Sequence, residues 1–190
     1  YSFTPYKPKG AGRSSIGGLF FLSETNPLLA LNAENLAYAF RTVLNGYSRS
    51  IAASLSGDVP AWLSSGLGQV YETFEERSGG KAALIGRPDS GMVAFLKGGT
   101  PMPLARLTGI RWDDPDLVPG GLQRSRFDAH AWALVHYLSF GPRRSQFAKY
   151  MASLHAGTAD GPAFAEAFCD TRALESELSD YIRKFLFPAL

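Results

Sequence analysis

Two segments with helical periodicity in the first half of the chain constrain its fold more than any other feature. Between residues 34 and 56, apolar side chains recur at steps of three and four residues, the period of one face of an α-helix. Gly57 and Pro60 close this segment, and Pro60, a residue favoured in the first turn of a helix, begins a second segment that extends to residue 77. The sequence therefore predicts two consecutive helices, 34–56 and 60–77, that face each other across a short loop.

Strand signals lie on both sides of this helix pair. Ile16–Ser23 and Leu28–Asn32 are β-leaning runs separated by an Asn-Pro turn signal, which predicts a hairpin or a pair of adjacent strands. The Pro- and Gly-rich residues 1–15 are predicted to form a short edge strand that continues into a loop. Lys81–Ile85 favours one more short strand.

The rest of the chain is predicted to be mainly helical. Pro88–Lys97 has the pattern of a short helix, and four helices are predicted to close the chain: Phe127–Phe140, Arg143–His155, Pro162–Cys169 and Thr171–Phe187. The predicted fold class is α+β, with a small N-terminal sheet packed on the helix pair and a helical C-terminal part. We expect a single domain, 1–190, with the sheet and the helix pair in residues 1–100 and the helical part in residues 101–190.

The composition is that of a globular protein and excludes several functional classes. Hydrophobic residues make up 45% of the 190 residues, and the formal net charge is +2, with acidic and basic residues interspersed. The absence of a polybasic run argues against nucleic acid as a partner. No apolar run reaches the length of a membrane span.

Two features bear on the cellular compartment and leave it open. Cys169 is the only cysteine, so it forms no internal disulfide and does not distinguish a reducing from an oxidising compartment. The chain begins at Tyr1 rather than Met, and we therefore expect a processed product or a fragment, with any signal peptide or anchor upstream of it.

The helix pair carries a recognisable motif. Val-Leu-Asn-Gly-Tyr-Ser-Arg at 43–49, followed by Val-Pro-Ala-Trp-Leu-Ser-Ser-Gly-Leu-Gly-Gln at 59–69, resembles the peptidase-MA-like gluzincins, bacterial domains whose usual motifs are HExxH and P-x-W-L-x-E-G-L-A-E. Trp-Ala-Leu-Val-His-Tyr-Leu at 132–138 and the terminal segment 181–187 also match, so the resemblance covers nearly the whole chain. It implies a metallopeptidase-like fold and a bacterial source, and it is compatible with export to the periplasm.

The zinc-binding residues of that family are replaced in this chain. A gluzincin site needs two His one helical turn apart, a Glu beside the first His to activate water, and a third ligand from the following helix. The resemblance places Asn45 and Arg49 at the His positions, Gly46 at the general base and Ser65 at the third ligand. Asn45 is a poor zinc ligand, Gly46 has no side chain, and Arg49 keeps a positive charge where the dication would bind.

Two further positions of the motif have also changed. The later acidic position is Gln69, and Asp128 stands where the family often has a Tyr whose phenol could stabilise a tetrahedral intermediate. A carboxylate has the wrong charge for that role. The resemblance therefore implies a degenerate site that holds no zinc or other cofactor, in a catalytically inactive pseudo-peptidase domain. Such a domain would serve as a peptide- or protein-binding module or as a structural element.

The family also suggests where a partner would bind. Gluzincins receive an extended peptide along the edge strand beside the active-site helix, and by analogy residues 18–23 or 28–32 would form that edge. Arg49 is expected to pair with a carboxylate, either from a bound partner or from an internal acid such as Asp128 or Glu72.

Two alternatives stay open. The first is a zinc peptidase with non-standard ligands, such as His130 or His136 with Asp128, although two His six residues apart do not share a helix face. The second is a scaffold that docks into a larger assembly. A serine hydrolase is not favoured, because the chain has no Gly-x-Ser-x-Gly elbow.

Overall fold

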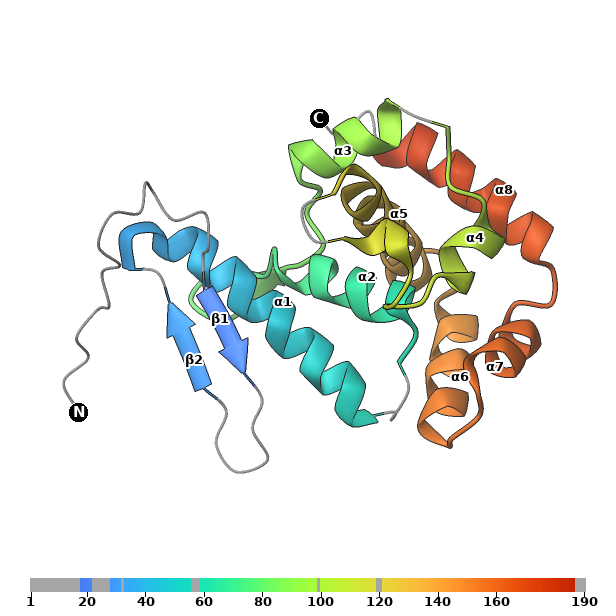
Figure 1. Cartoon of the computed structure of the whole chain (residues 1–190), viewed down its shortest axis with the longest axis horizontal. Helices are drawn as coiled ribbons and strands as arrows, with labels where there is room; N and C mark the ends of the chain where they lie inside the picture. The colour runs from blue at the N-terminus through green and yellow to red at the C-terminus, as the bar shows by residue number, and fades with distance from the viewer. Residues whose placement is uncertain are drawn as a thin grey trace.

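The centre of the molecule is a pair of closely packed helices. A computed structural model describes residues 18–21, 28–31, 33–55, 59–98, 100–118 and 121–186 of the chain. Helix α2 (Ala61–Tyr71) packs along helix α5 (Leu122–Phe140), and most side chains from Phe127 to Leu138 are buried. The two helices lie in the middle of the fold, with the other helices around them (Figure 1).

A glycine allows α2 and α5 to approach closely. A Cβ atom built on Gly66 would lie 2.4 Å from Cγ2 of Val135 and 2.5 Å from the carbonyl oxygen of Ala131. Real Cβ atoms do not come this near to other heavy atoms, so any larger residue at position 66 would push the helices apart.

The remaining helices surround this pair and add an aromatic core. They are α3 (Ser90–Lys97), α4 (Leu104–Gly109), α6 (Arg144–His155), α7 (Asp160–Ala167), α8 (Thr171–Tyr181), the 3₁₀ turns η1 (Ala33–Asn35) and η2 (Pro115–Leu117), and the π-helical segment η3 (Ile182–Leu186). Trp62 of α2 stacks on Tyr150 of α6 with ring centroids 5.7 Å apart, and it meets Phe164 of α7 edge-on at 5.9 Å. Each such ring pair contributes about 0.5–1.5 kcal/mol beyond the burial of its surface.

Helix α1 (Leu36–Leu55) joins the core through its polar face. It lies between α2 and the antiparallel hairpin of β1 (Gly18–Phe21) and β2 (Leu28–Leu31), in which Gly18 is opposite Leu31 (Figure 1). The apolar stripe of α1 remains largely in solvent, with exposed fractions of 43–56% for Leu36, Phe40, Tyr47 and Ile51. Arg41, Asn45 and Arg49 instead face α2.

The α+β fold class, the N-terminal hairpin and the consecutive helix pair are confirmed, and two boundaries are corrected. The second helix of the pair ends at Tyr71 rather than at residue 77, because residues 75–77 form strand β3 (Glu75–Arg77), which pairs with β4 (Ala82–Leu84). The turn between these strands has positive φ angles at three residues, 56° at Ser78, 62° at Gly79 and 81° at Gly80. Glycine adopts such angles without strain, and two of the three residues are glycines.

The second correction concerns the start of α5. The helix begins at Leu122, five residues before the predicted start. The prediction missed this first turn because its residues are mostly polar and show no apolar periodicity. The predicted edge strand at 1–15 and the helix stop at Gly57 lie outside the described residues. In the described part of the chain, no helix is long and apolar enough to cross a membrane.

The contact at Gly66 gives a test of the central packing. We expect Gly66→Ala to lower the free energy of unfolding by about 2 kcal/mol, because the clash with Val135 and Ala131 exceeds the gain in helix propensity. Urea unfolding of the purified variant measures the change.

Gly161→Ala is the matched control. Gly161 is also helical, in α7, but a Cβ atom built there meets nothing within 4 Å. This variant should be as stable as the parent chain or slightly more stable. Equal stability of the two variants would show that α2 and α5 are not packed as described.

Candidate functional site

The facing surfaces of α1 and α2 contain the positions that the sequence motif singled out. Three contacts, one per helical turn, define an antiparallel register between the helices: Arg41 with Glu72, Asn45 with Gly68, and Arg49 with Ser64. Each step of four residues forward along α1 is matched by four residues back along α2. Polar side chains therefore line this interface at every turn, where two amphipathic helices would normally bury apolar ones.

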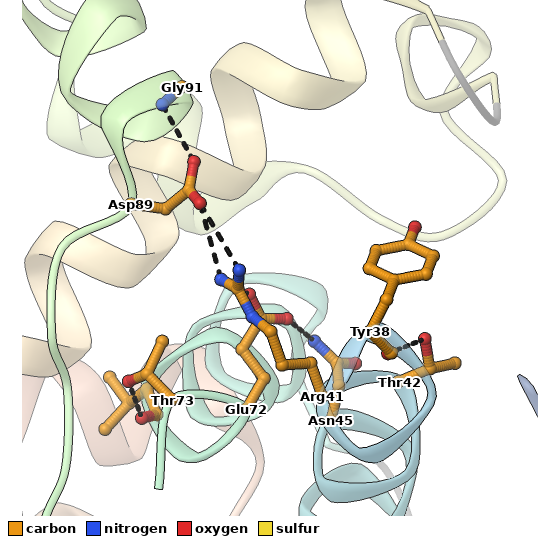
Figure 2. A network of polar contacts seen from close by, with 9 residues as sticks. Tyr38, Arg41, Thr42, Asn45, Glu72, Thr73, Asp89 and Gly91 are labelled. Carbon is orange, nitrogen blue, oxygen red and sulfur yellow. Dashed lines mark hydrogen bonds and ion pairs between the residues drawn. The ribbon is translucent and has the colours of Figure 1, made fainter. Parts of the chain in front are cut away.

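The first group of these side chains, here called the Glu72 cluster, comprises Arg41, Asn45, Gln69, Glu72 and Asp89. Glu72 Oε2 accepts a hydrogen bond from Asn45 Nδ2 at 2.9 Å, and Arg41 Nη2 donates to Glu72 Oε1 at 3.1 Å. With its amide nitrogen turned toward Glu72, Gln69 lies 3.2 and 3.3 Å from the two carboxylate oxygens. Figure 2 shows Asn45, Glu72 and Arg41 converging from the two helices.

Asp89 connects this cluster to a third helix. Its Oδ2 lies 3.4 Å from Arg41 Nη2, while its Oδ1 caps the start of α3 by accepting a hydrogen bond from the Gly91 amide at 2.8 Å (Figure 2). Burial raises the pKa of Glu72, and the hydrogen bonds from Asn45 and Arg41 act in the opposite direction. The Glu72 cluster is thus a network of one arginine and two acids that holds α1, α2 and α3 together. The Glu72 side chain is 15% exposed, whereas those of Arg41 and Asp89 are 38% and 37% exposed.

The second group, here called the Asp128 cluster, comprises Arg49, Ser64, Ser65, Trp112, Arg124 and Asp128. Asp128 Oδ1 accepts a hydrogen bond from Ser65 Oγ at 2.6 Å. Arg124 Nε donates to both Asp128 oxygens, at 3.0 and 2.9 Å. The Asp128 side chain is 19% exposed, so this ion pair is well shielded from water.

Arg49 lies at the edge of this cluster, and it makes no ion pair with any of the described residues. Its Nε donates to Ser64 Oγ at 3.3 Å, and its guanidinium carbon lies 4.6 Å from the centroid of the Trp112 ring. Burial lowers the pKa of Arg49, the charge of Arg124 lowers it further, and the charge of Asp128 opposes both. The cation is therefore held in an environment that disfavours it.

The expected ion pair of Arg49 with Asp128 or Glu72 is wrong. Within the described residues, Asp128 pairs with Arg124 and Glu72 pairs with Arg41, and neither pairs with Arg49. The physical reason is spacing. Arg124 lies one turn before Asp128 on the same helix, and Arg41 lies directly opposite Glu72 in the helix register.

The predicted site residues fall into both clusters. Asn45 and Gln69 belong to the Glu72 cluster, whereas Arg49, Ser65 and Asp128 belong to the Asp128 cluster. Gly46 belongs to neither cluster: its carbonyl accepts a hydrogen bond from Ser50 Oγ, at 2.9 Å, within α1.

Four important residues escaped the sequence reasoning: Arg41, Asp89, Trp112 and Arg124. The spacing of four residues between Arg124 and Asp128 is a visible signal for an ion pair on one helix. Trp112 gave no signal, because a tryptophan in a loop far along the chain can be placed beside Arg49 only by the tertiary fold.

His130 and His136, the candidate metal ligands, lie in separate surroundings. The backbone amide of Met102 donates to His130 Nε2 at 3.1 Å, and His130 Nδ1 lies 2.8 Å from the carbonyl oxygen of Arg126. His136 Nδ1 lies 2.6 Å from the Tyr181 hydroxyl, and burial lowers the pKa of His136 to about 4. Both rings are held by protein partners.

The donor set around Asn45 and Arg49 does not fit a zinc ion. Its members are an amide, a guanidinium and two hydroxyls, and the nearest carboxylates are already bound by arginines. Among the described residues, no group of three or more His, Cys, Asp or Glu side chains is arranged to hold a metal.

Comparison with protein-family models, curated proteins and solved structures gives no match to the chain.

Removing the charge of Asp128 tests the second cluster. We expect Asp128→Asn to lower the free energy of unfolding by about 2–3 kcal/mol, because Arg49 and Arg124 would then share a shielded space without a carboxylate. Asp113→Asn is the control, since the Asp113 side chain is 86% exposed and its ion pair with Arg111 is long, at 3.8 Å. Denaturant unfolding that gives equal losses for both variants would contradict a buried Asp128 cluster.

His136 makes the stability of the fold depend on pH. Its pKa is about 4 in the folded chain and about 6.5 when unfolded, so the unfolded chain binds more protons between these values. Stability should be complete above about pH 6.5 and fall by about 2 kcal/mol near pH 4.5, with allowance for solvent around the partly exposed ring. Unfolding of the parent chain and of His136→Gln across this range measures the effect.

His130 adds to the same pH dependence, because burial also lowers its pKa. His136→Gln should therefore make the slope shallower without removing it. A slope that is unchanged in His136→Gln would mean that another group causes the acid sensitivity.

Proposed function

We propose that this chain is a catalytically inactive, metallopeptidase-like domain that binds a peptide or protein segment at its former active-site cleft. The observation that carries the proposal is the antiparallel register of α1 and α2, with Asn45 and Arg49 one turn apart on α1 and Ser65 on α2. A zinc peptidase would place two His at such positions on its first helix and a third ligand on the following helix. In this chain the Ser65 hydroxyl turns to Asp128 of α5.

The chemistry at these positions supports the loss of catalysis. Gly46 has no side chain to act as a base, and the Asn45 amide is committed to Glu72. Arg49 stays protonated, and two unit charges of like sign 4 Å apart repel each other by about 4 kcal/mol near a protein surface. A dication at this place would be repelled more strongly still.

A binding role is favoured over a purely structural one by the state of Arg49. The Glu72 cluster neutralises Arg41 with two acids, as a structural network does. Arg49 is partly buried, is disfavoured as a cation, and contacts a serine and an indole ring. A charge that lowers stability in this way is typical of a site used for function.

The first test is metal content and hydrolysis. We expect the purified chain to hold far less than one zinc per molecule by elemental analysis, even after incubation with zinc, and to leave casein intact with or without chelator. Stoichiometric zinc, or casein cleavage that a chelator abolishes, would overturn the proposal.

A reconstructed site provides the positive control. The combined variant Asn45→His, Gly46→Glu, Arg49→His and Ser65→Glu restores the family's ligand types on the same two helices. We expect it to bind zinc and to be stabilised by it against heat, because a metal that binds only the folded chain raises the melting temperature. A folded variant with no affinity for zinc would argue against a zincin-like arrangement of α1 and α2.

A further inference from the structure

The two arginines of the Asp128 cluster have hydrogen-bonding capacity that the protein leaves unused. Arg49 donates through Nε to Ser64, and Arg124 donates through Nε to Asp128. Among the described residues, none accepts a hydrogen bond from the terminal nitrogens of either guanidinium. Each arginine therefore keeps the planar pair of N–H groups with which it binds carboxylates in a bidentate manner.

Both guanidinium groups meet at one aromatic ring. The guanidinium carbons of Arg49 and Arg124 lie 4.6 and 5.2 Å from the centroid of Trp112. With Asp128 as the single carboxylate, the cluster carries a net charge of +1. The Glu72 cluster one turn away combines Arg41 with Glu72 and Asp89, for a net charge of −1. An anion is therefore attracted to the Trp112 end of the α1–α2 interface.

A groove begins at the same tryptophan. It has a volume of about 820 Å³, and its apolar lining includes Val59, Pro60, Leu104, Ile110, Trp112 and Phe164. This volume is within the range of sites that bind small ligands. Trp112 is 41% exposed, whereas Trp62 and Trp132 are fully buried.

Three acids also line the groove: Asp113, Asp160 and Glu175. Asp113 is exposed and forms a long ion pair with Arg111, at 3.8 Å. Asp160 Oδ1 accepts a hydrogen bond from the Tyr150 hydroxyl at 2.6 Å, and Glu175 Oε1 accepts one from the Leu104 amide at 3.0 Å. Their negative charge would repel an acidic group in the groove itself. A ligand with one acid and one apolar side chain therefore has a single favoured orientation.

We propose that Arg49 and Arg124 bind the carboxylate of a peptide, and that a neighbouring apolar side chain of this peptide enters the groove beside Trp112. The inference rests on the proposed function, because it names the class of peptide that the inactive cleft takes. The carboxylate comes from an Asp or Glu side chain or from the C-terminus of the peptide, and the experiment separates these two sources.

The probe is an array of random dodecapeptides. Each sequence is printed twice, attached through its N-terminus, once with a free C-terminal carboxylate and once as the amide. The full chain should bind peptides enriched in Asp or Glu next to Leu, Ile, Phe or Val, or else peptides whose binding requires the free C-terminus. Acrylamide quenching of tryptophan fluorescence should decrease when the selected peptides are added, because Trp112 is the exposed tryptophan.

Substitutions of Arg49 and Arg124 test whether these two side chains bind the carboxylate of the peptide. Arg49→Met should lower the affinity for the selected peptides about tenfold, the effect of losing a charge-assisted hydrogen bond. Arg49→Lys and Arg124→Lys keep the charge but lose the planar fork, so they should lower the affinity by a smaller factor. Arg144→Met changes an exposed arginine in the first turn of α6 and should have no effect.

The melting temperature of each variant accompanies the binding data. Arg49→Met should melt at the same temperature as the parent chain or higher, since the variant removes a partly buried cation that makes no ion pair with the described residues. Weaker binding at unchanged or greater stability then separates a ligand contact from a structural role.

Three outcomes are distinguishable. Acid-dependent binding that falls in Arg49→Met and stays intact in Arg144→Met supports the inference. Peptide binding with no preference for a carboxylate, or with a preference that Arg49→Met retains, overturns the inference and leaves the proposed function standing. A complete absence of peptide binding overturns both.

Discussion

The close contact of α2 with α5 is the constraint on which the rest of the structure depends. Gly66 lets α2 lie against Val135 and the backbone of Ala131, and this approach fixes where Ser65 meets Asp128. The hydroxyl–carboxylate distance of 2.6 Å and the pairing of Asp128 with Arg124 both follow from it. Because α5 is buried along most of its length, it acts as a rigid reference for the candidate site. The second side of the site, helix α1, is then positioned by polar contacts to α2 rather than by the hydrophobic core.

A polar interface between two helices requires that each buried group has a partner, which makes the register specific. A shift of α1 by one turn would place Arg41 near Gly68 and would leave Glu72, raised in pKa by burial, without its two donors from α1. The cost of an unpaired buried charge is several kcal/mol, so this register is strongly favoured over its neighbours. The interface of α1 and α2 also carries net charges of opposite sign at its two ends. One end combines Arg41 with two acids and has a net negative charge, and the other ends at Arg49, Arg124 and Trp112 with a net positive charge.

Much of the architecture could be predicted from the sequence, because periodicity and turn residues act locally. The hairpin of β1 and β2, the long helix α1 and the C-terminal helices all follow from such signals. The start of α5 and strand β3 could not be placed, since the polar turn at Gln123 to Ser125 and the charged residues 75–77 carry no hydrophobic pattern. The apolar stripe of α1 was visible, but its surroundings were not: Phe40 and Tyr47 are half exposed, and the polar face packs inward. Periodicity reveals that a helix has two faces, but the tertiary fold decides which of them meets the core.

The chemistry of the candidate site could likewise be predicted only in part from the sequence. A motif identifies positions on one helix and the next, and Asn45 and Arg49 do meet α2, at Gly68 and Ser64, whereas Ser65 turns to Asp128 of α5. The motif does not identify which acid forms an ion pair with which arginine, because these pairs depend on residues that α5 and the loop at Trp112 contribute. Arg124 reaches Asp128 at lower cost than Arg49 does, since the two lie one turn apart on a single helix. This competition leaves Arg49 without an ion pair in the part of the chain that the structure describes. A partly buried guanidinium in that state lowers the stability of the free chain, and a carboxylate from a bound peptide would restore the balance.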